Sequence, residues 1–120
     1  MTKKIVYDKF KMKGKNMLEI NFEFRKGIFF MRIIGDFCDE NYYEETKKIK
    51  ELILFNKFKY IVINTNYLEK IDLNGLNNLL EIFYITKNNN SNLVICDKSN
   101  IFKRLLNGNF PIIKDEIEVL

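Results

Sequence analysis

The sequence contains no histidine, and this absence excludes several kinds of catalytic site. Ser-His-Asp and Cys-His arrangements need an imidazole base, most zinc sites use histidine ligands, and histidine is the usual general base near neutral pH. The chain also lacks a P-loop, a glycine-rich dinucleotide fingerprint and a CxxC pair. We therefore expect a protein that is not an enzyme and that holds neither a metal ion nor a cofactor.

Serine and cysteine, two common nucleophiles, are also scarce. Ser91 lies in the polar loop NNNSN, and Ser99 precedes the segment NIFKRLL, where its hydroxyl can cap a helix. The cysteines Cys38 and Cys96 are too few for the disulfide framework of a secreted domain. Cys96 ends the apolar run NLVIC and is interpreted as a small buried residue.

Long hydrophobic runs are missing as well. No window reaches the 18 or more apolar residues of a membrane helix, and the N-terminus lacks the apolar region of a signal peptide. The 120 residues, 47% of them hydrophobic with 11 Phe and 6 Tyr, can bury about two-thirds of their unfolded surface. We expect one globular domain in the cytoplasm.

The net charge of +4 is concentrated near the N-terminus. Residues 1–16 carry six lysines and one aspartate, whereas residues 17–120 have a net charge of −1. We interpret residues 1–16 as a basic arm and residues 17–120 as the domain. A solvated tail explains the arm better than a nucleic-acid or lipid site does, because the rest of the chain is nearly neutral.

Periodicity predicts the first half of the domain. The alternating segment MLEINFEFR, residues 17–25, and the segment IFFMRIIGDF, residues 28–37, are typical of strands, and Gly27 lies in the turn between them. Asp39 is then expected to cap a helix that starts at Glu40. Acidic residues lie early in this helix and lysines 47, 48 and 50 later, an order that suits the helix dipole.

The second half alternates between short apolar runs and helical patterns. Strands are expected at 59–64, 93–96 and 110–113. One helix is expected from its N-cap Asp72 to about residue 87, another over SNIFKRLL, and one helical turn over the last six residues. The order ββαβαβαβ predicts an α/β fold with an antiparallel hairpin, a mostly parallel sheet and right-handed crossovers. In such a sheet functional corners lie where strands end and helices begin, which draws attention to residues 64–75.

The residues of this corner resemble a known family. The segment YIVINTNYLEKIDLNGLNNLLEIF is similar to the signature region of STAS domains, the anti-sigma factor antagonist family. In that family a strand leads to Asp-Ser-Ser-Gly-Leu at the start of a helix. Asp72, Gly75 and Leu76 match this motif, while Leu73 and Asn74 occupy the places of the two serines. Upstream, MRIIGDF resembles the family's Gly-Glu-Leu-Asp strand end, with Cys38 in place of the aspartate.

The resemblance implies a bacterial module that binds proteins and regulates transcription. In the family, a serine kinase of ATPase fold, itself an anti-sigma factor, phosphorylates the second serine and thereby loses its docking partner. Asn74 has no hydroxyl to accept phosphate and is interpreted as a mimic of the unphosphorylated, binding-competent state. We expect partner-binding residues along the corner, and Thr65 is the hydroxyl nearby that could still be phosphorylated. The expected partner-binding residues are Asn66, Tyr67, Leu68, Asp72, Leu73, Asn74 and Gly75.

Two further interpretations stay open. The chain could be a small STAS subunit of an ABC-type membrane transport assembly, which would bind a transporter ATPase and reach the membrane only through that partner. It could also bind RNA or lipid through the basic arm, an interpretation that the charge distribution disfavours.

Overall fold

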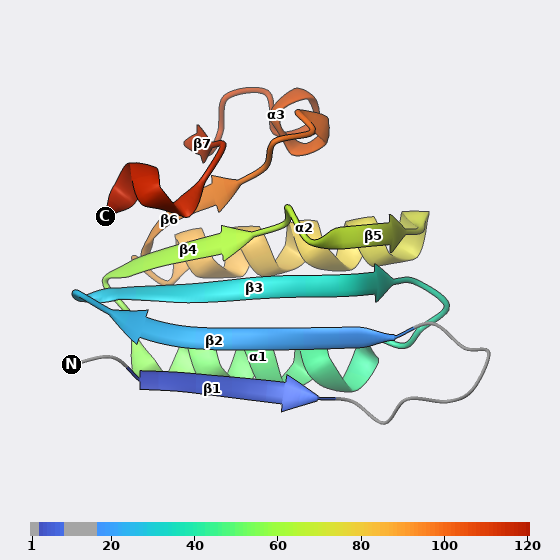
Figure 1. Ribbon diagram of the computed structural model, residues 1–120, viewed down its shortest axis with the longest axis horizontal. Helices are drawn as coiled ribbons and strands as arrows, with labels where there is room; N and C mark the ends of the chain where they lie inside the picture. The colour runs from blue at the N-terminus through green and yellow to red at the C-terminus, as the bar shows by residue number, and fades with distance from the viewer. Residues whose placement is uncertain (1–2, 9–16) are drawn as a thin grey trace.

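The computed structural model describes the backbone of residues 3–8 and the whole of residues 17–120. In these residues seven strands form one sheet in the order β1-β2-β3-β4-β6-β7, with β5 beside β3. The two longer helices, α1 and α2, lie against one face of this sheet (Figure 1). The strands are β1 Lys3–Asp8, β2 Leu18–Arg25, β3 Ile28–Phe37, β4 Tyr60–Asn64, β5 Leu68–Ile71, β6 Asn92–Cys96 and β7 Ile112–Ile113. The helices are α1 Tyr43–Asn56, α2 Leu73–Asn88, α3 Ile101–Leu106 and the 3-10 turn η1 Glu116–Val119.

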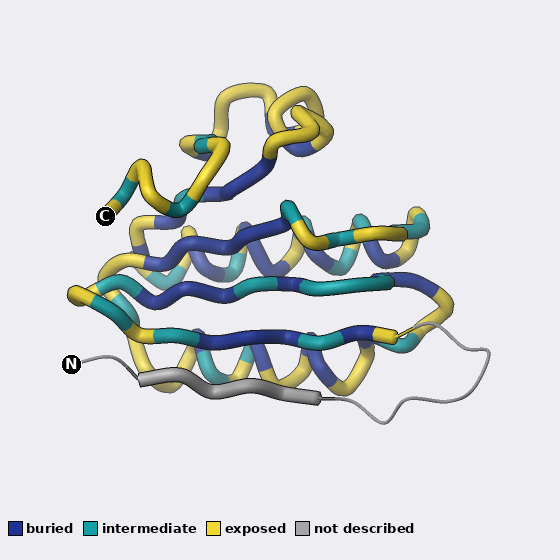
Figure 2. The backbone as a smooth tube through the Cα atoms, viewed as in Figure 1, coloured by how far each residue is buried: buried dark blue, intermediate teal, exposed yellow. Residues whose placement is uncertain are grey.

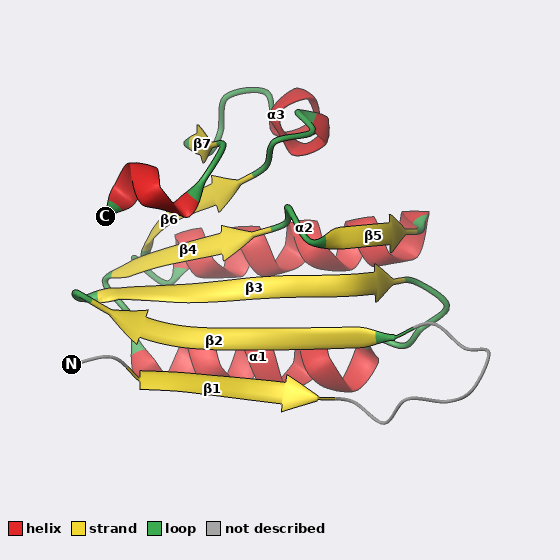
Figure 3. Ribbon diagram, in the orientation of Figure 1, coloured by secondary structure: helices red, strands yellow, loops and turns green. Residues whose placement is uncertain are grey.

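The sheet is mixed, as the sequence predicted. β2 and β3 form the expected antiparallel hairpin through Lys26 and Gly27, both of which have positive φ, as a tight hairpin turn requires. β1 also pairs antiparallel with β2, whereas β4, β5, β6 and β7 all pair in parallel. Figure 3 shows the strands in front and the long helices behind them. The predicted α/β class is confirmed.

β3 is long enough to pair with two strands in line. Its first half pairs with β4, and its last residues, from Gly35 to Phe37, pair with β5. β5 was not predicted, because the four-residue segment LEKI has two exposed polar residues between half-buried ends and no apolar alternation. This strand converts the expected loop before α2 into an ordered edge.

The main core lies between the sheet and the helices. Alternate residues of β2, β3, β4 and β6 face α1 and α2, and the central strands are almost wholly buried (Figure 2). Phe30, Val62 and Cys96 form a second, smaller cluster, against which Val119 of η1 packs. The C-terminal turn therefore covers part of the sheet.

The start of α1 differs from the prediction. Asp39 and Glu40 have φ of 54° and 63°, so both are left-handed, and the helix begins only at Tyr43 without a side-chain cap. The predicted N-cap at Asp39 is wrong, because Asp39 and Glu40 lie in a turn ahead of the helix, where the backbone N–H of Asp39 donates to the carboxylate of Asp72. The helix ends at Asn56. Lysines 47, 48 and 50 follow the acidic first turn, as predicted, but they lie in the middle of the helix, and its last turn holds no basic residue.

The other elements agree more closely with the prediction. α2 begins after Asp72, which caps it, and α3 ends at left-handed Asn107. β7 is the predicted edge strand, and Asp115 caps the predicted C-terminal turn. On α2 the helical spacing predicts a buried stripe of Leu73, Leu76, Leu80 and Phe83. Phe83 is fully buried as predicted, but Leu76 and Leu80 are half-buried and Leu73 is 71% exposed. Leu79 and Ile82, outside the predicted stripe, fill the core beside Phe83.

The predicted basic arm is described only in part. Within it, Lys3–Asp8 form β1 at the edge of the sheet, beside β2. Residues 1–2 and 9–16 lie outside the described residues. The division between an arm at 1–16 and a domain at 17–120 stays a prediction.

Candidate functional site

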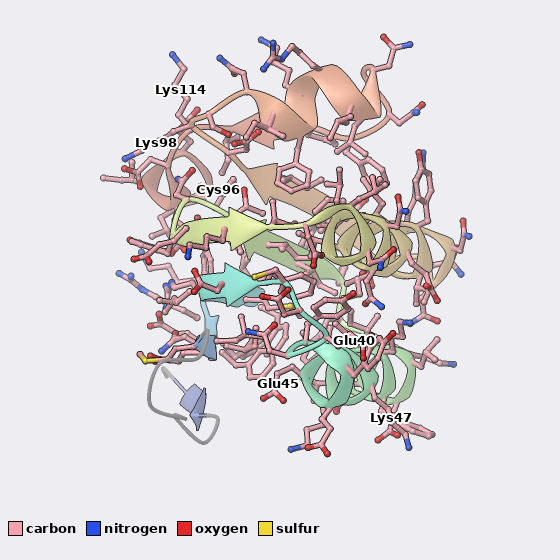
Figure 4. The ribbon with its side chains drawn as sticks, turned by 90° about the vertical axis from the view of Figure 1, so that its right-hand side faces the viewer. Glu40, Glu45, Lys47, Cys96, Lys98 and Lys114 are labelled. Carbon is pink, nitrogen blue, oxygen red and sulfur yellow. The ribbon has the colours of Figure 1, made fainter. Side chains whose placement is uncertain are left out.

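Two strands end where α2 begins. β3 ends at Phe37, which pairs with Ile71 at the end of β5, and Ile71 directly precedes the helix cap Asp72. β4 ends earlier along the sheet, at Asn64, which pairs with Arg32. Figure 4 looks onto this end of the molecule. There Glu40 and Lys47 lie on the side of the helices, and Lys98 and Lys114 lie together on the side of the uncovered sheet face. Parallel strands thus bring together loops that are far apart in the sequence.

The carboxylate of Asp72 joins two of these loops. Its Oδ1 accepts a hydrogen bond from the backbone N–H of Gly75 at 2.7 Å, which caps α2. Its Oδ2 accepts one from the backbone N–H of Asp39 at 2.9 Å, which holds the loop after β3. The hydrogen bonds from Asp39 and Gly75 lower the pKa of Asp72 below its ordinary value, so the side chain is ionised at neutral pH.

Gly75 is required by the close approach of α2 to β3. A Cβ atom at this position would lie 2.2 Å from the carbonyl oxygen of Phe37 and 3.1 Å from its ring. Sequence alone does not decide whether Gly75 allows the close approach of a partner's backbone or the packing of α2 against a neighbouring loop. Within the chain itself the glycine serves packing, and it is buried. Gly35 has a similar role, since its φ is 97° and a Cβ would lie 2.4 Å from the carbonyl oxygen of Met17.

The expected partner-binding residues divide into exposed and supporting ones. Leu73 and Tyr67 are 71% and 54% exposed, and Asn74 is exposed as well. Leu68, expected to be an exposed contact, is instead half-buried, because it lies in β5 and packs against the core. The first turn of α2 therefore presents a leucine and an asparagine to solvent beside the ionised Asp72.

Asn66 holds three loops together rather than projecting outward. Its Nδ2 donates to the carbonyl oxygen of Lys114 at 2.9 Å and to the Sγ of Cys96 at 3.2 Å. Its Oδ1 accepts from the backbone N–H of Lys98 at 2.7 Å. Every polar atom of its amide group is thus engaged within the chain, and the loops after β4, β6 and β7 are fixed at one edge.

Cys38 occupies the loop between β3 and α1 without being available for chemistry. The side chain is 6% exposed, and its backbone N–H donates to the side-chain oxygen of Asn41. Burial, and next the charge of Asp39, raise the pKa of the thiol, so it stays protonated at neutral pH. Cys96 is fully buried, as predicted, and burial raises the pKa of its thiol to about 11.

One structural side chain at this end, that of Asp97, was missed. Asp97 is buried and accepts hydrogen bonds from the backbone N–H groups of Ser99 and Phe102, so it caps α3 more directly than the predicted Ser99 hydroxyl. That hydroxyl accepts only a 3.3 Å bond from Ile101. The sequence does hold a signal for this cap: Asp97 directly follows the apolar strand β6 and lies five residues before Phe102 of α3.

The arrangement supports recognition better than catalysis. Among residues 17–120 no group of three or more Cys, Asp or Glu side chains is placed to hold a metal ion. The described part of the chain also holds no helix that is both long and apolar enough to cross a membrane. What the edge does offer is a rigid helix start with exposed apolar and amide side chains and a fixed negative charge, which are properties of a protein-binding surface.

Comparisons with known proteins show which family and which solved structures the chain resembles. The family model of the STAS domain matches residues 19–108. Among solved structures, the anti-sigma factor antagonist SpoIIAA in its unphosphorylated form is similar, with a TM-score of 0.65 and 14% identity over 88% of this chain and 93% of that one. An anti-sigma factor antagonist from Mycobacterium paratuberculosis has a TM-score of 0.60 and 13% identity over 98% of this chain and 90% of its own. The TM-scores show that the three proteins share a fold, and at identities this low the likeness is one of fold alone.

Proposed function

The chain belongs to the STAS domain family, and from this premise we propose that it is a non-catalytic anti-sigma factor antagonist. In this proposal the chain docks an anti-sigma factor, a serine kinase of ATPase fold, and thereby releases a sigma factor. The docking surface consists of Tyr67, Asp72, Leu73 and Asn74. Asn66, Leu68 and Gly75 support it from beneath. The two antagonist structures of similar fold support this choice among the functions of the family.

The observation that carries the proposal is the position of Asn74. It lies in the first turn of α2, exposed, between the exposed Leu73 and the buried Gly75. This is where the family motif places its phosphorylated serine. An amide keeps this position polar and neutral and gives a kinase no hydroxyl to phosphorylate. The chain therefore docks its partner without phosphorylation control at this residue.

The acidic residues around Asn74 indicate which charge the partner surface should carry. The backbone of Asp39 is bonded to the Asp72 carboxylate, so two acidic residues meet beside Asn74, and Glu40 follows directly. A partner surface with basic side chains would complement them. An added carboxylate at Asn74 itself is unfavourable for docking for a different reason: it would lose its hydration in the interface without a cation placed to pair with it, although the helix dipole tolerates it within the fold.

A pull-down from the host lysate tests the proposal. The tagged protein is compared with Asn74→Asp and with Asn77→Asp, which places the same charge at an exposed position of the same helix. We expect mass spectrometry to identify an ATPase-fold kinase bound to the wild type and to Asn77→Asp and lost from Asn74→Asp. Capture of a transporter ATPase with membrane subunits would contradict the proposal and favour the transport-assembly function instead.

Restoring the hydroxyl provides a second test. The variant Asn74→Ser recreates an acceptor at the family's phosphorylation position. We expect the captured kinase to phosphorylate this variant and to leave the wild type unmodified, as measured by intact mass. Phosphate on Thr65 of the wild-type protein would refute the absence of phosphorylation control near the docking surface.

A further inference from the structure

A cavity of about 480 Å³ lies at the end of the sheet opposite the docking surface. It is bounded by the turn between β2 and β3, the last turn of α1 and the segment that leads into β4. Its volume falls within the range of about 300–1,000 Å³ that is usual for small-molecule sites. The lining residues are Phe22, Phe24, Gly27, Phe29, Leu52, Asn56, Lys57, Phe58 and Lys59.

Four phenylalanine rings form a continuous apolar wall in this cavity. Phe29 stacks on Phe58 with ring centroids 4.1 Å apart, and Phe22 stacks on Phe29 at 5.5 Å. Phe24 lies 6.1 Å from Phe58 and is 37% exposed. The main core therefore continues to the surface here as an aromatic wall, where a flexible apolar chain could lie.

The polar part of the lining is cationic. Lys57 and Lys59 are both exposed, and no acidic side chain is among the lining residues of the described chain. The ammonium of Lys59 lies 5.5 Å from the ring centre of Tyr60. Asn56 uses its Nδ2 to cap the carbonyl oxygen of Leu52, so its amide oxygen is the remaining neutral group. An apolar cavity with two ammonium groups complements a ligand that is apolar at one end and anionic at the other.

We propose that this cavity binds a free long-chain carboxylate. The hydrocarbon chain lies along the rings of Phe24, Phe29 and Phe58, and the carboxylate lies between Lys57 and Lys59. Burial of the hydrocarbon chain supplies the affinity, and the two charge-assisted contacts supply the preference for an acid over other amphiphiles. This site is independent of the docking surface and of the proposed function.

NMR titration of the ¹⁵N-labelled full chain with dodecanoate tests the proposal. Dodecan-1-ol and dodecyltrimethylammonium, which have the same chain length but a neutral or cationic head, serve as matched ligands. We expect saturable one-to-one binding of dodecanoate, with shift changes at the lining residues. The neutral and cationic ligands should bind at least tenfold more weakly.

Variants distinguish a specific role of Lys57 and Lys59 in binding from the effect of the overall charge of the chain. Lys57→Gln combined with Lys59→Gln should weaken dodecanoate binding by about tenfold or more, as expected for lost charge-assisted contacts. Lys103→Gln, which removes an exposed lysine of α3, should leave the affinity unchanged. All three positions are exposed, so these variants are expected to fold.

Several results would overturn the site. They are equal binding of the three dodecyl ligands, shift changes confined to other residues, an unaffected double variant, and absence of saturable binding. Binding to anionic vesicles without binding to monomeric dodecanoate would also overturn it, because it would assign the end of the molecule to a membrane surface instead.

Discussion

Neutralising Glu116 is expected to destabilise the fold by detaching the C-terminal turn. The Oε1 and Oε2 atoms of Glu116 accept two hydrogen bonds from the Arg32 guanidinium at 2.7 and 2.8 Å, and Oε2 accepts a third from Asn64 at 2.6 Å. The side chains of Arg32 and Glu116 are 19% and 14% exposed. This carboxylate holds η1 against the sheet face opposite α1 and α2, where Val119 packs against the cluster of Phe30 and Val62.

The magnitude follows from what glutamine can replace. The variant Glu116→Gln keeps one acceptor oxygen but loses the charge and one guanidinium contact, and hydrogen bonds to charged groups are worth about 1.5–3 kcal/mol. Arg32 retains Glu23 at 2.7 Å and Asn21 at 2.8 Å, so it is not left as an unpaired buried charge. We therefore expect the free energy of unfolding to fall by about 2–3 kcal/mol, below the cost of fully orphaning a buried ion.

The pH dependence has a definite sign. Burial alone would raise the pKa of Glu116, but the hydrogen bonds from Arg32 and Asn64, together with the Arg32 charge, hold it below its ordinary value of 4.5. Because the folded-state pKa is lowered, this stabilisation is complete above 4.5 and is lost as the pH falls through the folded-state value. The difference between wild type and Glu116→Gln should therefore shrink in acid.

Urea unfolding followed by circular dichroism measures both effects. Glu81→Gln is the matched control, because the Glu81 side chain is 56% exposed and pairs at 2.9 Å with that of Lys50, which is 27% exposed. An exposed pair of this kind is worth about 1 kcal/mol or less. Equal costs for the two variants, or a difference that persists in acid, would refute the assignment of Glu116 as the anchor of η1.

Three further predictions concern α2, its cap and its buried face. Gly75→Ala should destabilise the domain by about 1–3 kcal/mol in urea unfolding, because its Cβ meets the Phe37 carbonyl oxygen; a gain in stability, usual for Gly→Ala in helices, would refute this close approach. Asp72→Asn should lower stability at neutral pH but not below the lowered folded-state pKa of Asp72, and an effect that does not vary with pH would argue against the charge. Phe83→Ala should cost about 3–5 kcal/mol, since the ring is fully buried, and a cost below 1 kcal/mol would contradict its place in the core.

Periodicity carried most of the fold prediction. The strands of the hairpin, β4 and β6 were visible because apolar residues recur every second position or run continuously. β5 escaped because its four residues gain order from pairing with β3 rather than from their own pattern. The position of Asp39 was misjudged for a related reason. Its backbone N–H donates to the carboxylate of Asp72, and sequence spacing does not reveal this contact between distant loops.

The candidate site was predictable in position but not in its interior. Asp72 as a cap followed from helix-start chemistry, and the surface position of Asn74 followed from the motif. The exposure of Leu73 did not follow, because helical spacing assigned this residue to the apolar stripe of α2. The inward role of Asn66 and the anchoring role of Glu116 depend on loops that are distant in the sequence. Such contacts are set by sheet order, which local patterns do not fix.

In the proposed antagonist function, Asn74 lies at the contact between this domain and its protein partner. The most direct test is the dissociation constant of the purified partner for the wild type, Asn74→Asp and Asn77→Asp. We expect a loss of at least about tenfold for Asn74→Asp, because an unpaired carboxylate would lose its hydration in the interface, and less than about twofold for Asn77→Asp. Equal affinities for all three proteins would contradict the claim and place the docking surface elsewhere.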